Sequence, residues 1–395
     1  MKDVTLSTQC NACGSKNLEL VFESPLLPLT GVYLREGDGN VNLPTFDQAF
    51  MYCMDCGHGQ LQNLISPNVL YDDTYTHRTS TSPIATRGND FFYQQLRKIT
   101  KDRKFRSLLE IGCNDLYLLN RTQELAENLV GIDPIWNGQD HDLNPKTRVL
   151  GRFVENIEVG VDVIHKPDLI LSAHTFEHIQ DLYGQLASLV DLAADNCLFV
   201  IEVPGFDSMV KLRRFDQVFH QHIQYTSLSS MRALISRLGC AYLGHVYNYA
   251  YWGGTFMFWF EKRKADGNIG LQGFEAQTLN HVKGAFTEFK TMLRCSRDQA
   301  ASLGEKCYGF GAAQMLPILA YHMESDFGFM EAILDDNPER SMCRLPGVSP
   351  VIRAPIDGEV HDAAVMITAL DSTRPILKRL IELNPRRILN PVHSF

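Results

Sequence analysis

At residues 108–116 the chain reads Leu108-Leu109-Glu110-Ile111-Gly112-Cys113-Asn114-Asp115-Leu116. Its apolar beginning predicts a buried strand, and Gly112 predicts a tight turn at which the backbone can approach a ligand closely. A second apolar run ends about twenty residues later on an acid, in Gly131-Ile132-Asp133-Pro134. An acid at that place can accept hydrogen bonds from both hydroxyls of a ribose. The two runs together predict a nucleoside-binding edge of an open α/β sheet.

Further apolar runs continue this pattern along the chain. Helix-like segments separate the earlier ones, which lie at 128–132, 169–172 and 197–203, and another run follows at 254–261. Alternation of this kind predicts an α/β fold with a central, mostly parallel sheet. No helix separates Ala241–Tyr247 from the last run, so these two are expected to form an antiparallel pair at one edge.

The length of 395 residues exceeds what one hydrophobic core usually supports, so several domains are expected. We predict a β-rich module at 1–80, a central Rossmann-like domain at 81–265, a linking helix at 266–300 and a second α/β domain at 301–395. The last of these begins with a strand and glycine turn at Lys306–Gly311, and further strand candidates follow at 332–336, 363–369 and 387–390.

The charge balance restricts the partners of the chain. Lys and Arg number 37 against 46 Asp and Glu, which gives a net charge of -9, the wrong sign for binding a nucleic acid or an anionic membrane surface. No segment reaches the ~18 apolar residues that a membrane helix needs, and the N-terminal residues lack an apolar signal core. We therefore expect a cytoplasmic protein without membrane or nucleic-acid partners. Oligomeric state is not readable from the sequence.

Four of the ten cysteines form two closely spaced pairs, Cys10-x-x-Cys13 and Cys53-x-x-Cys56. Two such knuckles can place four thiolates around one tetrahedral zinc ion, which leaves no open position for a catalytic water. The pattern predicts a structural zinc site. His58, which follows the second pair, is expected near the metal or at the surface rather than as a ligand.

Two histidine-rich segments follow the apolar runs of the central region. His178 ends His174-Thr175-Phe176-Glu177-His178, and its position alone favours a solvated histidine at a helix end. The segment Phe215–His222 contains His220 and His222. Histidine can accept a proton near neutral pH, so either segment could supply a general base. The His-x-His pair could also bind a metal, but no third ligand is evident.

The Glu110-x-Gly112 turn with Asp133 downstream resembles the cofactor site of class I S-adenosylmethionine methyltransferases. An NAD site would instead require Gly-x-Gly-x-x-Gly. The ordered set of both cysteine pairs, Glu-Ile-Gly-Cys-Asn-Asp, His178, Phe-Asp-Gln followed by His222, and a C-terminal Gly-x-Gly turn with Leu345-Pro346-Gly347 resembles the sugar C-methyltransferases. Members of that family act on nucleotide-linked keto-deoxysugars and combine a zinc module, a methyltransferase domain and a C-terminal α/β domain.

The resemblance implies roles for particular residues. His222 matches the histidine proposed to remove the proton beside the sugar ketone, and His178 and Tyr75 match side chains that could hydrogen-bond the developing oxyanion. The resulting enolate would attack the methyl group of S-adenosylmethionine. The cofactor would be bound by the motif residues Glu110, Gly112, Asn114, Asp115 and Asp133.

Two positions depart from the family pattern. The family usually has a glutamate directly before the base histidine, whereas Gln221 stands here and cannot supply a charge that raises the pKa of the base. The family also closes its cofactor turn with glycine, where this chain has Leu116. A leucine there could crowd the methionine end of the cofactor.

Three alternatives stay open. The departures could mark a divergent member that methylates oxygen or nitrogen, or that only binds. A zinc-ribbon interaction or nucleic-acid-binding protein would require a basic surface, which the acidic balance does not support. A dehydrogenase could use Gly309, Gly311 and Asp335, although the third glycine of an NAD site is missing.

Overall fold

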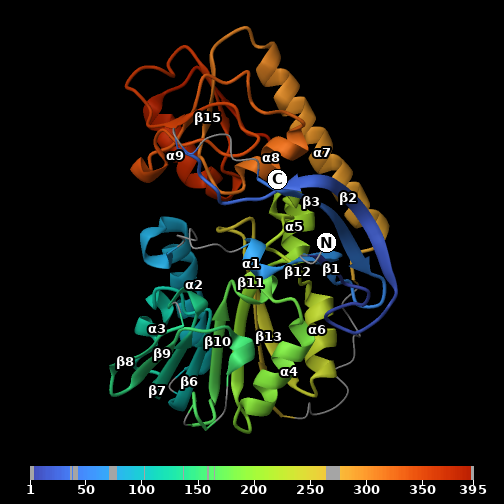
Figure 1. The fold of residues 1–395 in the computed structure, drawn as a ribbon, viewed down its shortest axis with the longest axis vertical. Helices are drawn as coiled ribbons and strands as arrows, with labels where there is room; N and C mark the ends of the chain where they lie inside the picture. The colour runs from blue at the N-terminus through green and yellow to red at the C-terminus, as the bar shows by residue number, and fades with distance from the viewer. Residues whose placement is uncertain are drawn as a thin grey trace.

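The computed structural model describes residues 4–35, 38, 43–70, 78–101, 103–136, 138–157, 160–163, 165–263 and 276–392. Tyr75, for which the sequence predicts an active-site role, lies outside the described residues. The central sheet occupies the lower part of Figure 1, the C-terminal residues lie above it, and strands β2 and β3 run along one side.

An eight-stranded sheet forms the centre of the chain, in the order β8-β9-β7-β6-β10-β11-β14-β13. Strands β9, β7, β6, β10 and β11 are parallel, whereas β14 runs antiparallel to both β11 and β13. The strands are β6 (Phe105–Ile111), β7 (Ala126–Ile132), β8 (Asp140–Asn144), β9 (Thr147–Leu150), β10 (Leu169–Ala173), β11 (Leu198–Pro204), β13 (Ala241–Asn248) and β14 (Thr255–Glu261). The α/β fold and the antiparallel pair predicted from the sequence are thereby confirmed.

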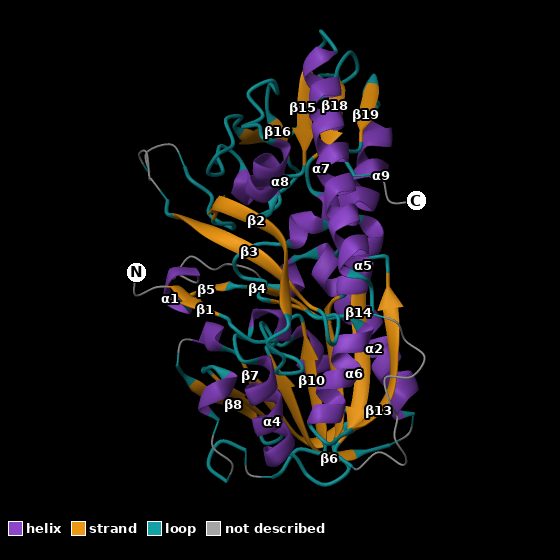
Figure 2. Cartoon of the chain, turned by 90° about the vertical axis from the view of Figure 1, so that its right-hand side faces the viewer, coloured by secondary structure: helices purple, strands orange, loops and turns teal. Residues whose placement is uncertain are grey.

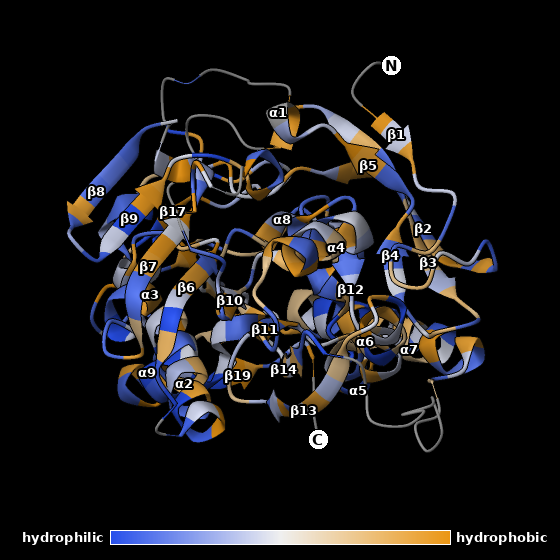
Figure 3. Cartoon of the chain, turned by 90° about the horizontal axis from the view of Figure 1, so that it is seen from below, coloured by the Kyte–Doolittle hydropathy of each residue, from blue (hydrophilic) through white to orange (hydrophobic). Residues whose placement is uncertain are grey.

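Helices cover both faces of this sheet. On one face, α2 (Pro83–Thr100) and α3 (Tyr117–Arg121) pack through residues such as Phe92 and Leu118 onto Leu108 and Leu171. Helix α2 begins where Ser82 caps it and Pro83 fixes its first turn. On the other face, α4 (Leu182–Leu192) and α6 (Leu228–Arg237) bury their leucines against the strands. Strand β8, at the open edge, is largely hydrophilic, as an exposed edge requires (Figure 3).

The N-terminal module contains two small antiparallel sheets. Its elements are β1 (Val4–Leu6), β2 (Leu18–Pro28), β3 (Thr45–Cys53), β4 (Gly59–Leu61), β5 (Asn63–Ile65) and α1 (Pro67–Leu70). The larger sheet has the order β12-β4-β3-β2. Its first strand, β12 (Gln224–Tyr225), comes from the middle of the chain and pairs with Gly59 and Gln60 of β4. No local pattern in the sequence indicates that residues 224 and 225 add a strand to the N-terminal sheet.

Residues from 307 onward form a five-stranded parallel sheet in the order β17-β16-β15-β18-β19. Its elements are β15 (Cys307–Phe310), α8 (Leu316–Met323), β16 (Ile333–Leu334), β17 (Ile352–Arg353), β18 (Ala364–Ile367), α9 (Thr373–Leu383) and β19 (Arg387–Leu389). The long helix α7 (Leu279–Ser302) runs beside this sheet and continues toward the central one (Figure 2).

One hydrophobic cluster joins all these parts. It contains Phe50 of β3, Phe215 shortly before β12, Phe289 of α7 and Leu319 of α8, each almost fully buried. The remaining short helices are α5 (Phe206–Leu212) and the single-turn segments Thr79–Thr81, Pro134–Trp136, Val154–Asn156, Phe176–His178, Phe215–Gln217, Pro338–Arg340 and Leu370–Ser372. No helix in the described part of the chain is both long and apolar enough to cross a membrane.

Candidate active site

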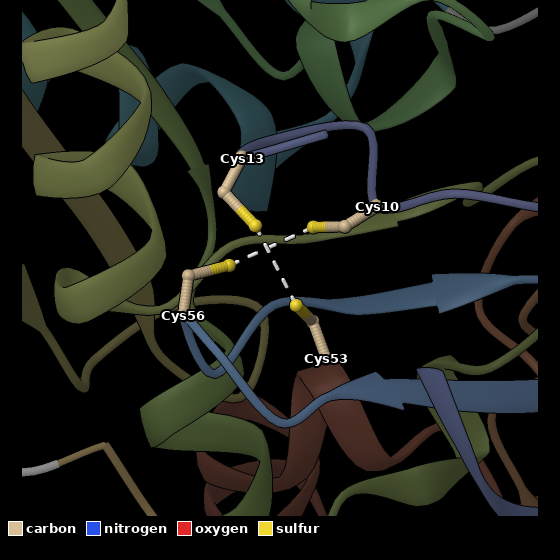
Figure 4. Close-up of side chains that lie close together, drawn as sticks. All are labelled: Cys10, Cys13, Cys53 and Cys56. Atoms are coloured by element: carbon tan, nitrogen blue, oxygen red, sulfur yellow. Dashed lines mark hydrogen bonds between the residues drawn. The ribbon is translucent and has the colours of Figure 1, made fainter. Parts of the chain in front are cut away.

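The four paired cysteines converge on one point (Figure 4). The sulfur atoms of Cys10 and Cys56 lie 3.6 Å apart, as do those of Cys13 and Cys53, and all four lie within 4.8 Å of one another. Four Zn–S bonds of about 2.3 Å at tetrahedral angles would separate the sulfurs by about 3.8 Å. The chain therefore provides a tetrahedral site of four thiolates with the size that zinc requires.

Hydrogen bonds join this zinc site to the segment around His222. His58 is fully buried beside the cysteines, and its Nε2 lies 2.9 Å from Oε1 of Gln224. Gln224, two residues after His222, donates through Nε2 to the carbonyl oxygen of Ile179 at 2.9 Å. The hydroxyl of Ser229 donates to the carbonyl oxygen of Cys56 at 2.8 Å. As expected, His58 lies next to the metal site, and its hydrogen bonds make it a link to the histidine segment.

The carboxylate of Asp133 fixes the glycine turn after β6 through hydrogen bonds from backbone amides. The amides of Asn114 and Ile135 donate to its two carboxylate oxygens at 2.8 and 3.0 Å, and burial raises the pKa of Asp133. Gly112 has φ +74°, and a Cβ there would lie 1.9 Å from Oγ1 of Thr175, so only glycine fits.

The other predicted cofactor residues surround the same turn. Asn114 and Asp115 accept hydrogen bonds from the amides of Thr79 and Ser80 at 3.0 and 2.8 Å, which ties the single turn Thr79–Thr81, just before α2, to the glycine turn. One carboxylate oxygen each of Glu110 and Asp115 is buried without a hydrogen-bond partner, and burial raises the pKa of Glu110 well above its usual range. Such acceptors fit the hydroxyl and amino donors of S-adenosylmethionine, so these residues would hold the cofactor.

Leu116 lies in this turn with φ +69°, a left-handed conformation that explains why a glycine is usual there. Its side chain is buried in the apolar cluster under α2 and α3. The leucine therefore packs beneath the turn.

Replacing Leu116 by glycine should remove this packing while relieving backbone strain. We expect the free energy of unfolding to fall by up to about 4 kcal/mol, since a lost buried leucine costs about 2–5 kcal/mol and the relieved strain returns about 1–2 kcal/mol. Leu118→Ala, on regular helix in the same cluster, should show the full packing loss. Urea unfolding measures both, and calorimetry with S-adenosylhomocysteine should show unchanged affinity. A tenfold gain in affinity would mean that Leu116 crowds the cofactor.

His178 and His222 lie side by side beyond the strand ends, with ring centroids 5.0 Å apart and the ring planes inclined edge to face at 64°. Nδ1 of His178 donates to the carbonyl oxygen of Gln221 at 2.8 Å, which fixes the orientation of the ring. Nδ1 of His222 is buried and has no hydrogen-bond partner, and burial lowers the pKa of His222 to about 3. His222 is thus neutral near pH 7, and its Nδ1 can accept a proton in the tautomer that carries the hydrogen on Nε2. His220 points elsewhere and hydrogen-bonds to the carbonyl oxygen of Leu27 at 3.0 Å.

The side chain of Gln221 turns away from the histidines. Its Oε1 accepts a hydrogen bond from the hydroxyl of Thr30 in the N-terminal module at 3.1 Å. Only its backbone carbonyl faces His178.

A buried charged group directly beside the histidines escaped prediction from the sequence. His174 lies between Glu177 and Glu202, with Nδ1 3.2 Å from one carboxylate and Nε2 3.3 Å from the other. Burial opposes the charged form of His174, but the two glutamates raise its pKa to about 10. Likewise, burial opposes ionisation of Glu177, but His174 lowers its pKa to about 2. The adjacent pair Glu177-His178 at a strand end was the available signal.

Two family models match the chain. Residues 86–245 match the family described as "Methyltransferase domain", and residues 10–71 match "Putative zinc binding domain". A curated relative, the C-methyltransferase NovU of Streptomyces niveus, is 26% identical over 243 residues, which cover 58% of this chain and 55% of NovU. The chain thus matches only about half the length of this relative.

Solved structures resemble the central part of the chain. The N-methyltransferase NodS from Bradyrhizobium japonicum WM9 in complex with S-adenosyl-L-homocysteine is 14% identical, with a TM-score of 0.36, over 48% of this chain and 92% of NodS. The YcgJ protein of a Bacillus is 12% identical, with a TM-score of 0.35, over 45% of this chain and all of YcgJ. The fold assignment rests on the strand order and the family matches. The chain therefore contains an S-adenosylmethionine-dependent methyltransferase domain joined to a four-cysteine zinc-binding domain.

Proposed function

We propose that this protein transfers the methyl group of S-adenosylmethionine to a carbon atom beside the ketone of a nucleotide-linked keto sugar. The observation that carries the proposal is His222, a partly exposed neutral imidazole whose Nδ1 has no partner, beside His178 in the turn that follows β10. Methylation of oxygen or nitrogen can use a lone pair of the acceptor, whereas carbon must first lose a proton to a base.

In the proposed reaction His222 accepts the proton from the carbon next to the ketone, and the C–H electron pair moves into the enolate. The carbonyl of Gln221 holds the ring of His178 beside His222 through Nδ1–H. Nε2 of His178 would therefore donate to the developing oxyanion only when both ring nitrogens carry a hydrogen. S-adenosylmethionine supplies the electrophilic methyl group, and its sulfur leaves with the C–S electron pair as S-adenosylhomocysteine. Tyr75 keeps its predicted role as a second donor to the oxyanion.

Two further observations support the substrate class. The relative NovU bears the name C-methyltransferase. The order of the cysteine pairs, cofactor turn and histidine segment also resembles the sugar C-methyltransferases. Thr30 brings the N-terminal module to Gln221, so that module borders the proposed substrate site.

The test begins with calorimetric titration of zinc-loaded protein with S-adenosylhomocysteine, for which micromolar affinity is expected. A panel of nucleoside-diphosphate-linked keto-deoxyhexoses is then incubated with S-adenosylmethionine, and methylated product is located by mass spectrometry and NMR. In D2O with S-adenosylhomocysteine, the carbon that becomes methylated should exchange its proton. Methylation at an oxygen or nitrogen, with no exchange at carbon, would contradict the proposal.

A further inference from the structure

Glu177 is a buried carboxylate that lies next to His222, the proposed base. It directly precedes His178 in the single turn after β10, and only 1% of its surface is exposed. One carboxylate oxygen contacts His174 at 3.2 Å and lies 4.0 Å from Nε2 of His178. The other oxygen, Oε2, is buried and has no hydrogen-bond partner. Glu177, His178 and His222 each have a polar atom within 4.8 Å of those of the other two.

The backbone fixes Glu177 relative to His222. The amide of Ile223, directly after His222, donates to the carbonyl oxygen of Glu177 at 2.7 Å. On the other side of His222, the carbonyl of Gln221 accepts from the ring of His178 at 2.8 Å. Two hydrogen bonds therefore connect the Glu177-His178 turn to the residues on either side of the base.

His174 fixes the side chain of Glu177 in turn. Its imidazolium bridges Glu177 and Glu202, and its ring packs against Trp252 with centroids 4.3 Å apart. His174 adopts φ +55°, a strained conformation for a residue with a side chain, which the two carboxylates stabilise. The group contains two carboxylates and one imidazolium, so it keeps one net negative charge beside the histidine pair.

His222, the proposed base, requires a negative charge nearby when it accepts a proton. When a buried imidazole accepts a proton, the positive charge is costly unless an anion lies near it. Gln221 is neutral and its side chain binds Thr30. His178 and His174 oppose the protonated form of His222, whereas the carboxylate of Glu177 favours it and raises the pKa of His222 against their effect.

We infer that Glu177 is the positioning residue that stabilises the protonated form of His222 during proton abstraction, in the role that Gln221 cannot fill. The inference rests on the proposed function. As His222 takes the proton and the C–H electron pair enters the enolate, the new imidazolium faces the carboxylate of Glu177. His174 keeps that carboxylate ionised and in place.

Two substitutions of Glu177 distinguish the effect of its negative charge from the effect of its side-chain shape. Glu177→Gln keeps the shape and loses the charge, whereas Glu177→Asp keeps the charge and shortens the side chain. With S-adenosylhomocysteine and the keto sugar that wild-type protein exchanges in D2O, Glu177→Gln should lower kcat for exchange about 10²-fold. Glu177→Asp should stay within about tenfold of wild type. Glu261→Gln, a largely buried glutamate at the opposite end of the sheet, is the matched control and should exchange normally.

Three results would overturn the inference. Exchange by Glu177→Gln equal to or faster than that by Glu177→Asp would show that shape alone matters. A rise in the dissociation constant of S-adenosylhomocysteine that accounts for the whole loss would make Glu177 a cofactor residue. Loss of wild-type exchange after mild chelation that spares the zinc of the four cysteines, with recovery on adding Mn²⁺, would make Glu177 a metal ligand. If wild-type protein exchanges no keto sugar of the panel, the proposed function itself fails.

Discussion

Replacing Cys53 by serine is expected to abolish zinc binding, unfold the N-terminal module and lower proton exchange at the substrate carbon by at least about 10²-fold. Structural zinc contributes on the order of 10–16 kcal/mol of binding free energy to a small domain, far more than a sheet of short strands can replace. The exchange should fail because β12 belongs to the sheet of this module and lies two residues after His222. Metal analysis, limited proteolysis and exchange in D2O measure the three effects.

S-adenosylhomocysteine should still bind this variant within a few-fold of wild type, because the cofactor turn lies on β6 and β7 of the central sheet. Cys295→Ser, which changes an exposed cysteine of α7, is the matched control and should retain zinc and activity. An intact module after complete zinc loss would show that the four cysteines are not structural ligands.

Replacing His222 by asparagine should lower kcat for both proton exchange and methyl transfer by roughly 10² to 10⁴, the usual contribution of a general base. Cofactor affinity should not change. Because burial lowers the pKa of His222 to about 3, wild-type protein should keep its full exchange rate as the pH falls through 6.5, where an ordinary histidine becomes protonated. Stopped incubations in D2O from about pH 5 to 8 measure this profile.

His220→Asn is the control for damage to the segment. His220 lies two residues away but bonds the carbonyl of Leu27, so its loss should lower stability while the exchange rate stays near wild type. If His222→Asn exchanges normally, the base is another residue, and His178 would be tested next.

The central sheet and the zinc site could be predicted because their signals are local. A buried parallel strand is a continuous apolar run, as at 108–112 and 197–203, and a knuckle holds its two ligands within four residues. The turn at Gly112 was readable for the same reason, since the glycine directly follows the apolar run, whereas its close contact with Thr175 was not.

The features that escaped prediction depend on contacts between distant parts of the chain. Strand β12 is only two residues long and becomes a strand through β4, more than 160 positions earlier. His174 and Glu202 are 28 positions apart and meet only because β10 and β11 are neighbours in the sheet. The sequence indicated that Leu116 could crowd the cofactor but not where its side chain points, which tertiary packing decides by burying it in the core under α2. The direction of the Gln221 side chain likewise follows from Thr30, which no local pattern connects to it.

The pairing of β12 with β4 also affects when the N-terminal sheet can be completed during synthesis of the chain. Both cysteine pairs leave the ribosome first and can bind zinc early, but their sheet lacks its edge until residues 224 and 225 have been made. An unpaired β4 would meanwhile present free backbone groups, which favour association between nascent chains. Capture of that edge by β12 completes the metal-binding sheet and places His222 in one event. Completion of the zinc module and placement of the base are therefore coupled steps of folding.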